Sequence, residues 1–424
     1  MQLNTATARL SLAVASLLTA AGSPAGAAEI PESGNWTDGP ARNRIEIGVL
    51  SYNESARVQV LEPVMRWSRS LGSERTLRVR LGYDSMTGAS PNGAMPASHP
   101  QTFTSPSGNR YTVETGSQPT RSFRDDRYAF GLEYEQPLNR TLRLSSGLNL
   151  SKETDYFSSG ASLSLAWDLD QRRTTVNLGA SVTEDRVTPR GGMAVPLSVY
   201  GAGEMQSSSS AGKHMQDVLL GFTRILNERT VFQFNATQGW DQGYLTEPYK
   251  GVSLVDGETG ALRGSRHESR PDTRSRTALY AKTAVHLPRD VVHLSYRWYN
   301  DDWGVTGHTV DLAYYMKLGR GHVLRPHLRW SGQSAADFHS YTLISGQTLP
   351  DYVSADSRLS DMSTLTAGLK YSLPLGPGTF SSKVEYMLQR MNVPSSQTPG
   401  VLNTMDVAPD LKVIMLSLGY DISF

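Results

Sequence analysis

The C-terminal stretch Leu411–Phe424, LKVIMLSLGYDISF, carries the pattern that decides the fold. Its apolar and aromatic residues occupy alternate positions: Ile414, Leu416, Leu418, Tyr420, Ile422 and Phe424. The later positions between them are small or polar, as at Ser417, Gly419 and Asp421. Because successive side chains of a strand point to opposite faces, this alternation predicts a β-strand with two different environments.

The same period of two recurs along the chain. Clear examples are Arg127–Pro137, Val291–Asp301, His308–Leu318 and His322–Gln333. In each, one face is apolar and rich in aromatic residues, and the other holds polar residues and charges. A soluble β-sandwich also alternates, but its polar face meets bulk water. An aromatic-rich outer face with a polar inner face favours an all-β fold, a transmembrane antiparallel up-and-down β-barrel.

Counting the alternating segments predicts about sixteen strands, each long enough to cross a bilayer at a tilt. They are Arg44–Tyr52, Arg57–Ser68, Thr76–Asp84, Arg127–Pro137, Thr141–Thr154, Gly160–Leu169, Thr174–Asp185, Met215–Leu226, Thr230–Trp240, Arg274–Leu287, Val291–Asp301, His308–Leu318, His322–Gln333, Thr364–Leu373, Thr379–Gln389 and Leu411–Phe424. An even number places both ends of the barrel on one side of the membrane. Because proline cannot donate to a ladder, Pro63 predicts a bulge or an edge.

The connections between these segments alternate in length. One set is uniformly short, and every long connection belongs to the other set: Ser85–Asp126, Arg186–His214, Asp241–Thr273, Ser334–Ser363 and Arg390–Asp410. Outer-membrane barrels have short periplasmic turns and long outer loops. The pattern therefore predicts termini in the periplasm.

The N-terminus predicts export. Residues 1–28 have the regions of a signal peptide, with an apolar run at Leu10–Ala21 and a cleavage pattern at Ala25 and Ala27. Residues 29–43 are expected to form a periplasmic lead-in and residues 44–424 the barrel. The expected location is the outer membrane of a Gram-negative bacterium, with outer-membrane lipid around the barrel.

The composition excludes several classes of protein. The 424 residues are 38% hydrophobic, with no cysteine and 41 basic against 40 acidic side chains. Without a long apolar run the chain is not a helical membrane protein, and without cysteine it has no thiol or disulfide chemistry. A near-zero net charge argues against a nucleic-acid partner. In a barrel only alternate residues face lipid, so low hydrophobicity is compatible with a membrane protein.

Parity within the strands predicts which charges face the lumen. The expected basic wall consists of Arg274, Arg276, Lys282, His293, Arg297, Lys317, Arg325, His327 and Arg329. The expected acidic groups are Asp84, Glu133, Glu135, Asp168, Asp301 and Asp311. A basic wall that faces a mixed, more acidic wall would create a transverse field that orients polar solutes and sets ion selectivity. The alternative is that these charges pair across strands and only solvate or plug the lumen.

The outer strand ends also carry acids and histidines. Asp301, Asp302, His308, Asp337 and His339 lie there, which raises the alternative of a hydrolase at the rim. No hydrolase motif accompanies them, and spacing alone is weak. Calcium at the rim has no regular ligand spacing to support it. We therefore expect no enzyme, no cofactor and no metal site.

Several stretches together resemble a known family. They are 84–94 (DSMTGASPNGA), 243–250 (GYLTEPYK), 268–274 (ESRPDTR), 295–304 (SYRWYNDDWG), 326–330 (PHLRW) with 333–338 (QSAADF), and 354–359 (SADSRL). Together they resemble the bacterial family known as domain of unknown function 3570, over nearly the whole mature chain. The chain departs from the family pattern at Glu247, where Asp is expected, and at His339, where an aromatic residue is expected.

The resemblance implies a Gram-negative outer-membrane barrel without an established activity. It also implies a small lipoprotein or an exported flavin or redox protein as a partner. The residues Leu416, Leu418, Tyr420, Ile422 and Phe424 resemble the signal by which barrel-assembly machinery recognises its clients. The sequence favours a pore or transporter for small polar solutes. The alternative is a closed structural or docking barrel that binds periplasmic or surface proteins.

Overall fold

The computed structural model describes residues 43–55, 57–97, 99–104, 110–117, 119–189, 192–200 and 206–424. The predicted signal peptide and all but the last residue of the predicted lead-in lie outside these ranges. No helix within the described ranges is long and apolar enough to cross a membrane.

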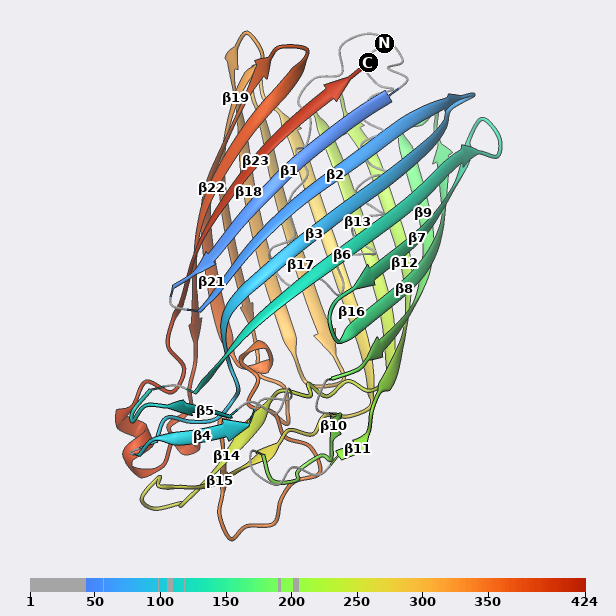
Figure 1. Ribbon diagram of the computed structural model, residues 1–424. Coiled ribbons are helices and arrows are strands. Elements are labelled where there is room, and N and C mark those ends of the chain that lie inside the picture. The colour runs from blue at the N-terminus through green and yellow to red at the C-terminus, as the bar shows by residue number, and fades with distance from the viewer. Residues whose placement is uncertain are drawn as a thin grey trace.

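The body of the protein is a closed antiparallel barrel of sixteen strands (Figure 1). In order around the barrel they are β1 (Asn43–Glu54), β2 (Val58–Gly72), β3 (Arg75–Pro91), β6 (Thr120–Pro137), β7 (Leu142–Lys152), β8 (Tyr156–Leu169), β9 (Thr174–Val187), β12 (Ala211–Asn227), β13 (Thr230–Gly243), β16 (Thr273–His286), β17 (Val291–Asp301), β18 (Thr306–Gly319), β19 (His322–Gln333), β21 (Met362–Leu375), β22 (Gly378–Met391) and β23 (Leu411–Ser423). Each matches one predicted segment, so the predicted fold class is confirmed.

The C-terminal strand closes the ring and shows the pleat clearly. β23 pairs with β1, with Leu418 opposite Val49 and Gly419 opposite Gly48. Its outward residues Ile414 and Leu416 are 56% and 46% exposed, whereas Val413 on the other face is fully buried. Outside the barrel the exposed apolar side chains meet lipid, and the inward face meets the lumen.

The expectation of a bulge or an edge at Pro63 is wrong. β2 lies between β1 and β3, and Val49 faces Pro63 in an unbroken register with β1. Towards β3 the pairing skips Glu62 and Pro63, but Leu61 opposite Ser85 and Val64 opposite Gly82 keep the same register. Because proline has no N–H to donate, pairing with β3 is lost locally, but no extra residue is inserted and no bulge forms.

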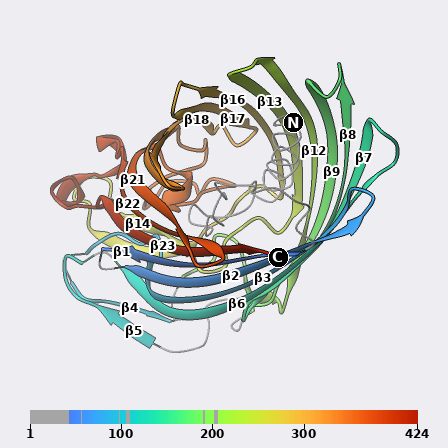
Figure 2. The same cartoon turned by 90° about the horizontal axis from the view of Figure 1, so that it is seen from above.

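The short connections lie at the same end as the C-terminus, and Figure 2 looks into the barrel from this end. The turn between β2 and β3 consists of Ser73 and Glu74, both in the left-handed region, with φ of 50° and 59°. Left-handed conformations at both central positions match the twist of the flanking strands in a tight hairpin.

The long connections build a separate layer at the other end, below the barrel in Figure 1. It contains the pair β4 (Gln101–Thr104) and β5 (Arg110–Val113), the pair β10 (Met193–Ala194) and β11 (Gln206–Ser208), and a sheet of β15 (Leu262–His267), β14 (Gly251–Val255) and β20 (Thr342–Ile344). Three short 3₁₀ turns, η1 (Ser357–Leu359), η2 (Ser395–Gln397) and η3 (Gly400–Thr404), complete it. We call the described residues of the five long connections, 92–119, 188–210, 244–272, 334–361 and 392–410, the cap.

The cap has a hydrophobic core of its own. Met95, Val255, Tyr341, Leu402 and Val407 form one buried cluster, and these residues come from four different connections. The fifth connection joins through Tyr200, which packs on Ala94. A shared core makes the five loops one folded layer and not five independent segments.

Candidate functional site

The residues of the expected basic wall lie on the lumen side of β16 to β19. Arg276 faces Asp301 across β16 and β17, and Arg297 faces Thr309 across β17 and β18. The alternate residues Leu294 and Tyr296 are 50% and 44% exposed on the outer face. By the same parity Arg274, Lys282, His293, Lys317, Arg325, His327 and Arg329 are inward residues.

Several members of this wall are paired with acids. Arg274 binds Asp301 at 2.5 Å, and Arg276 binds Asp241 at 2.7 Å and Asp217 at 3.2 Å. Side chains on neighbouring strands can reach one another in this way because strands lie about 5 Å apart. The wall is therefore less basic than its own residues suggest.

Further along, His327 bridges Asp311 at 2.7 Å and Glu385 at 2.9 Å. Arg325 donates to the Tyr315 hydroxyl at 3.2 Å, and the ring of His293 lies against the same tyrosine. Glu385 also binds Lys383 at 2.7 Å.

Four cations of the wall have no carboxylate partner within the described part of the chain: Lys282, Arg297, Lys317 and Arg329. The guanidinium of Arg297 lies 5.5 Å from the ring of Tyr299. Lys317 is exposed near the short-turn end of β18. Apart from Lys317, the unpaired positive charge of the wall lies on β16, β17 and β19.

The expected acidic groups of the opposite wall are also paired. Arg78 binds Glu133 at 2.7 Å and Glu135 at 3.3 Å. The other two pairs are Arg127 with Asp84 and Arg143 with Asp168. Most of the predicted lumen charges thus pair across strands, as in the alternative in which they only solvate or plug the lumen. A surplus of positive charge remains on one side.

Reasoning from selected strands missed Asp217, Asp241, Lys383 and Glu385. The parity of β12, β13 and β22 would have placed these residues inward, since each alternates with an outward apolar residue such as Leu220 or Val384. The missing signal was available in the sequence, because these partners lie within two strands of the wall on either side.

The residues of the expected assembly signal lie on the outer face of β23. Leu416, Leu418 and Phe424 are 46%, 44% and 61% exposed. The Tyr420 hydroxyl donates to the Leu375 carbonyl at 3.0 Å. The backbone of Phe424 exchanges two hydrogen bonds with Asn43, which fixes the C-terminus beside the start of β1.

The cap contains a buried network of charges that joins two of its loops. Arg270 binds Glu268 at 2.7 Å and Asp356 at 2.8 Å, and the three side chains are at most 9% exposed. Ser354 donates to Glu268 at 2.5 Å, and Arg358 binds Asp356 at 2.5 Å. We call Glu268, Arg270, Asp356 and Arg358 the latch, because the first two come from loop 244–272 and the others from loop 334–361.

The charge states of the latch follow from burial and neighbouring charges. Burial disfavours the ionised form of Asp356, but the positive charges of Arg358, Lys250 and Arg270 outweigh it and hold the pKa of Asp356 well below its usual range. Burial raises the pKa of Glu268, and Arg270 opposes that rise. Glu247 binds Arg358 at 3.2 Å, so the glutamate at this position contributes to the network.

Two histidines of the cap are buried near the latch. Burial lowers the pKa of His339 to about 4 and that of His267 to about 4. His339 packs edge-on against Tyr341, with ring centroids 4.8 Å apart, and His267 packs edge-on against Tyr200 at 4.9 Å. At neutral pH both rings are therefore uncharged.

The acids and histidines of the rim do not form a shared reaction centre. His308 bonds to the Tyr296 hydroxyl at 2.7 Å, whereas His339 is buried in the cap. Asp301 accepts from the backbone N–H of Trp303 and Val305 at 3.1 and 2.9 Å. Gly304, with φ of 84°, has the Asp337 carboxylate against it where a side chain would begin. These groups stabilise the turn after β17.

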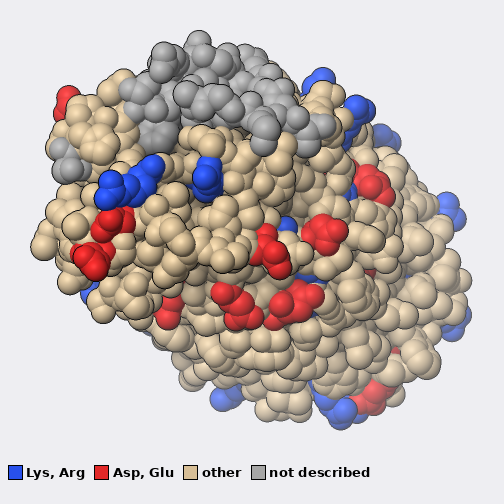
Figure 3. All heavy atoms as spheres, turned by 90° about the horizontal axis from the view of Figure 1, so that it is seen from below, with Lys and Arg blue, Asp and Glu red and all other residues tan. Residues whose placement is uncertain are grey.

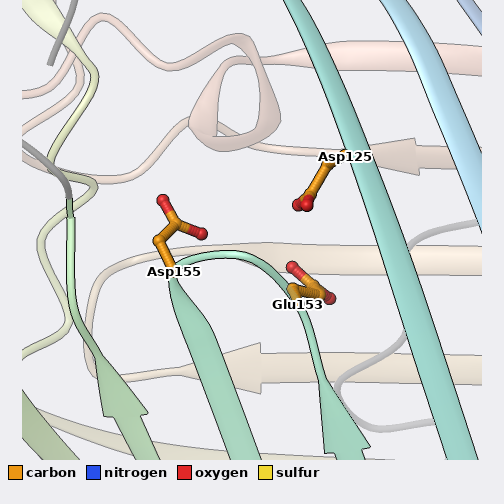
Figure 4. A group of neighbouring side chains, drawn as sticks. All are labelled: Asp125, Glu153 and Asp155. Carbon is orange, nitrogen blue, oxygen red and sulfur yellow. The ribbon is translucent and has the colours of Figure 1, made fainter. Parts of the chain in front are cut away.

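Within the described ranges, three carboxylates approach one another at a different place. Asp125 on β6 and Glu153 and Asp155 after β7 offer oxygens within 4.8 Å of one another (Figure 4). Burial and the charge of Asp125 raise the pKa of Glu153 to about 7. Asp125 also accepts from the Thr154 hydroxyl at 2.9 Å. The cap carboxylate Asp356 is instead bound to arginines.

A closed antiparallel barrel with an apolar outer face, a polar lumen and unequal ends is a transmembrane β-barrel. The family model described as "Protein of unknown function (DUF3570)" matches residues 8–422. The chain belongs to this family.

The matches among solved structures are of low similarity. The siderophore receptor PirA from Acinetobacter baumannii has 9% identity and a TM-score of 0.42, with 84% of this chain and 54% of that chain covered. The Pseudomonas putida toluene transporter TodX has 11% identity and a TM-score of 0.39, with 91% and 90% covered. The chain thus spans about half the length of the siderophore receptor. No curated protein matches the chain.

Proposed function

We propose that this protein is an outer-membrane pore or transporter for small polar solutes, with a cap that closes its outer end. The observation that carries the proposal is the polar lumen face, on which Lys282, Arg297 and Arg329 have no carboxylate partner within the described chain. A barrel of about sixteen strands is wide enough to leave an aqueous channel. Unpaired cations in such a channel attract polar and anionic solutes.

The orientation in the membrane follows from the two ends. Barrels of this kind have short turns in the periplasm and long loops outside. The cap therefore lies on the cell surface and the C-terminus in the periplasm. Three latch residues, Glu268, Arg270 and Asp356, are buried where two cap loops meet, and they stabilise the closed arrangement of those loops. Opening requires the separation of loops 244–272 and 334–361.

A second candidate function is a closed barrel that docks a protein partner. The observation in its favour is the shared core of the cap, which makes a folded surface suited to recognition. Away from the grey atoms, Figure 3 shows a continuous surface over this end, with acidic side chains near its middle. The partner would be a surface protein or, at the other end, a periplasmic lipoprotein or exported redox protein.

Single-channel recording distinguishes the two functions. The purified barrel is inserted into planar bilayers, beside a variant in which loops 244–272 and 334–361 are replaced by short turns. The pore proposal expects rare openings of the intact protein and steady conductance of the shortened one. Absence of conductance in both, for barrels that still show the heat-dependent gel shift of a folded barrel, overturns the pore and leaves the docking function.

A further inference from the structure

We propose that the outer wall of β6 to β9 carries a binding site for the phosphorylated headgroup of an outer-leaflet glycolipid. The inference rests on the outer-membrane location proposed above, but not on conductance. It concerns the outer face of the barrel, whereas the proposed pore concerns the lumen.

The first observation is a row of four residues across neighbouring strands. Tyr128 faces Lys152, Lys152 faces Phe157, and Phe157 faces Arg186. Tyr128 and Phe157 are 63% and 44% exposed, and Lys152 and Arg186 are exposed as well. Because neighbouring strands lie about 5 Å apart, the two cations stand roughly 10 Å apart with an aromatic ring between them.

Parity shows that the row faces lipid and not the lumen. On β7, Lys152 continues the outward positions of Leu148 and Leu150, which are 54% and 46% exposed. On β9, Arg186 continues the outward positions of Leu178 and Val182, which are 54% and 47% exposed. Lys152 therefore ends an apolar column at the cap end of the barrel, and Arg186 ends the neighbouring outward column on β9 after Glu184.

The second observation places this row at the level of the headgroups. On β8, Trp167 is the outward aromatic residue near the other end, 52% exposed, and 167 − 157 = 10 residues separate it from Phe157. Ten residues at about 3.4 Å each span roughly 34 Å along the strand. At a tilt of about 35–45° the height is roughly 24–28 Å, which matches the apolar band of about 25 Å between two aromatic girdles.

The third observation is a hollow in the outer wall beside Phe157. Its volume is about 400 Å³, and it is lined by Phe157, Ser159, the run Glu184–Arg186 and the segment 210–212. The Asp185 carboxylate in this run is paired with Lys213 at 3.3 Å. Arg186 donates to the Ser210 hydroxyl at 3.5 Å, which directs its guanidinium towards the hollow. A planar guanidinium beside a polar concavity suits a phosphate group, which it binds with two hydrogen bonds.

The acids on this face leave the two cations available. Within the described residues, neither Lys152 nor Arg186 has a carboxylate within ion-pair distance. Glu184 lines the hollow but bonds to His214 on β12, and Asp126 lies 3.9 Å from Arg124. The outer end of β22 offers a contrast, since the outward residue Arg390 is paired with Asp410 at 3.4 Å.

The test uses the full-length protein in detergent with three defined lipids: bisphosphorylated lipid A, the same lipid after removal of its phosphates, and phosphatidylglycerol. Native mass spectrometry measures the bound fraction of each. We expect the doubly substituted protein Lys152→Gln, Arg186→Gln to bind lipid A at least tenfold more weakly. The matched control Arg390→Gln removes an outward arginine at the same end and should stay within twofold of the unmodified protein.

Two outcomes overturn the proposal. One is equal lipid A binding by the double variant and the unmodified protein. The other is equal binding of lipid A and phosphatidylglycerol, which would indicate a generic anionic surface. The variant Arg186→Lys keeps the charge and loses the planar guanidinium. Its lipid A binding should lie between that of the unmodified protein and that of the double variant, and it replaces the double variant if that one does not fold. Conductance of the double variant should be unchanged, so failure of the lipid site and failure of the pore are distinguishable.

Discussion

Replacing Arg270 with methionine should open the cap without unfolding the barrel. Arg270 lies between Glu268 and Asp356, whose side chains are 0% and 1% exposed. Its removal leaves two carboxylates facing each other in a buried site. Loss of one partner from a buried ion pair costs about 3–5 kcal/mol, because the remaining charge is neither hydrated nor compensated.

The structure favours the lower end of that range. Asp356 keeps Arg358 as a partner at 2.5 Å, and Glu268 keeps the Ser354 hydroxyl at 2.5 Å. A loss of about 3 kcal/mol, at 1.36 kcal/mol for each factor of ten, raises the ratio of open to closed cap roughly 150-fold. Arg270 lies in the cap, between β15 and β16, and outside the barrel strands.

Native-state proteolysis measures this ratio, since the cleavage rate follows the population of the open form when reclosing is fast. Cleavage within 244–272 and 334–361 should accelerate about 150-fold, while the heat-modified gel shift of the barrel stays the same. Arg263→Met is the matched control. It breaks an exposed pair with Asp256 at 2.9 Å, a type of contact that contributes about 0–1 kcal/mol. Equal cleavage of Arg270→Met and the control would refute the role of the latch.

Three further predictions concern protons, ions and assembly. Burial lowers the pKa of His267 and His339 to about 4 from an ordinary 6.5, so between these pH values the open cap binds more protons than the closed cap. Cap stability should therefore fall as the pH drops from about 6.5 to about 4, by up to roughly 3 kcal/mol for each histidine. Protease sensitivity against pH measures this, and a flat profile would contradict it. The double substitution Arg297→Gln, Arg329→Gln should shift the reversal potential of the open pore towards cation preference in a salt gradient, and no shift would place the ion path elsewhere. Deletion of Phe424 should slow insertion by barrel-assembly machinery in a reconstituted system, and insertion at the normal rate would exclude it as part of the signal.

The barrel could be predicted from the sequence because its rule is local. A strand of a membrane barrel needs an apolar residue at every second position, and Ile414, Leu416 and Leu418 show this without reference to any partner. The even strand count and the alternation of short and long connections then fix orientation. The predicted strand ends were less accurate. β3 continues past Asp84, and β6 begins before Arg127, so that the two strands pair beyond their predicted ends.

The state of the lumen charges could not be predicted from parity alone. Parity places Arg276 inward, but its charge is offset by Asp217 and Asp241, which reach it from β12 and β13. Pairing depends on the stagger between strands, and a shift of two residues along one strand would keep every side chain inward and change every partner. The basic surplus of Lys282, Arg297 and Arg329 becomes visible only once the register is known.

The cap explains why the specific stretches of this sequence lie mostly outside the strands. Many apolar residues satisfy a lipid-facing position, so a barrel wall constrains the type of residue and rarely its identity. A buried ion network has no such freedom, because each charge needs its partner and its hydrogen bonds. The stretches 243–250, 268–274 and 354–359 meet in the latch through Glu247, Glu268, Arg270, Asp356 and Arg358. In the proposed function, these residues close the outer end of the barrel, and the wall holds the two latch loops side by side.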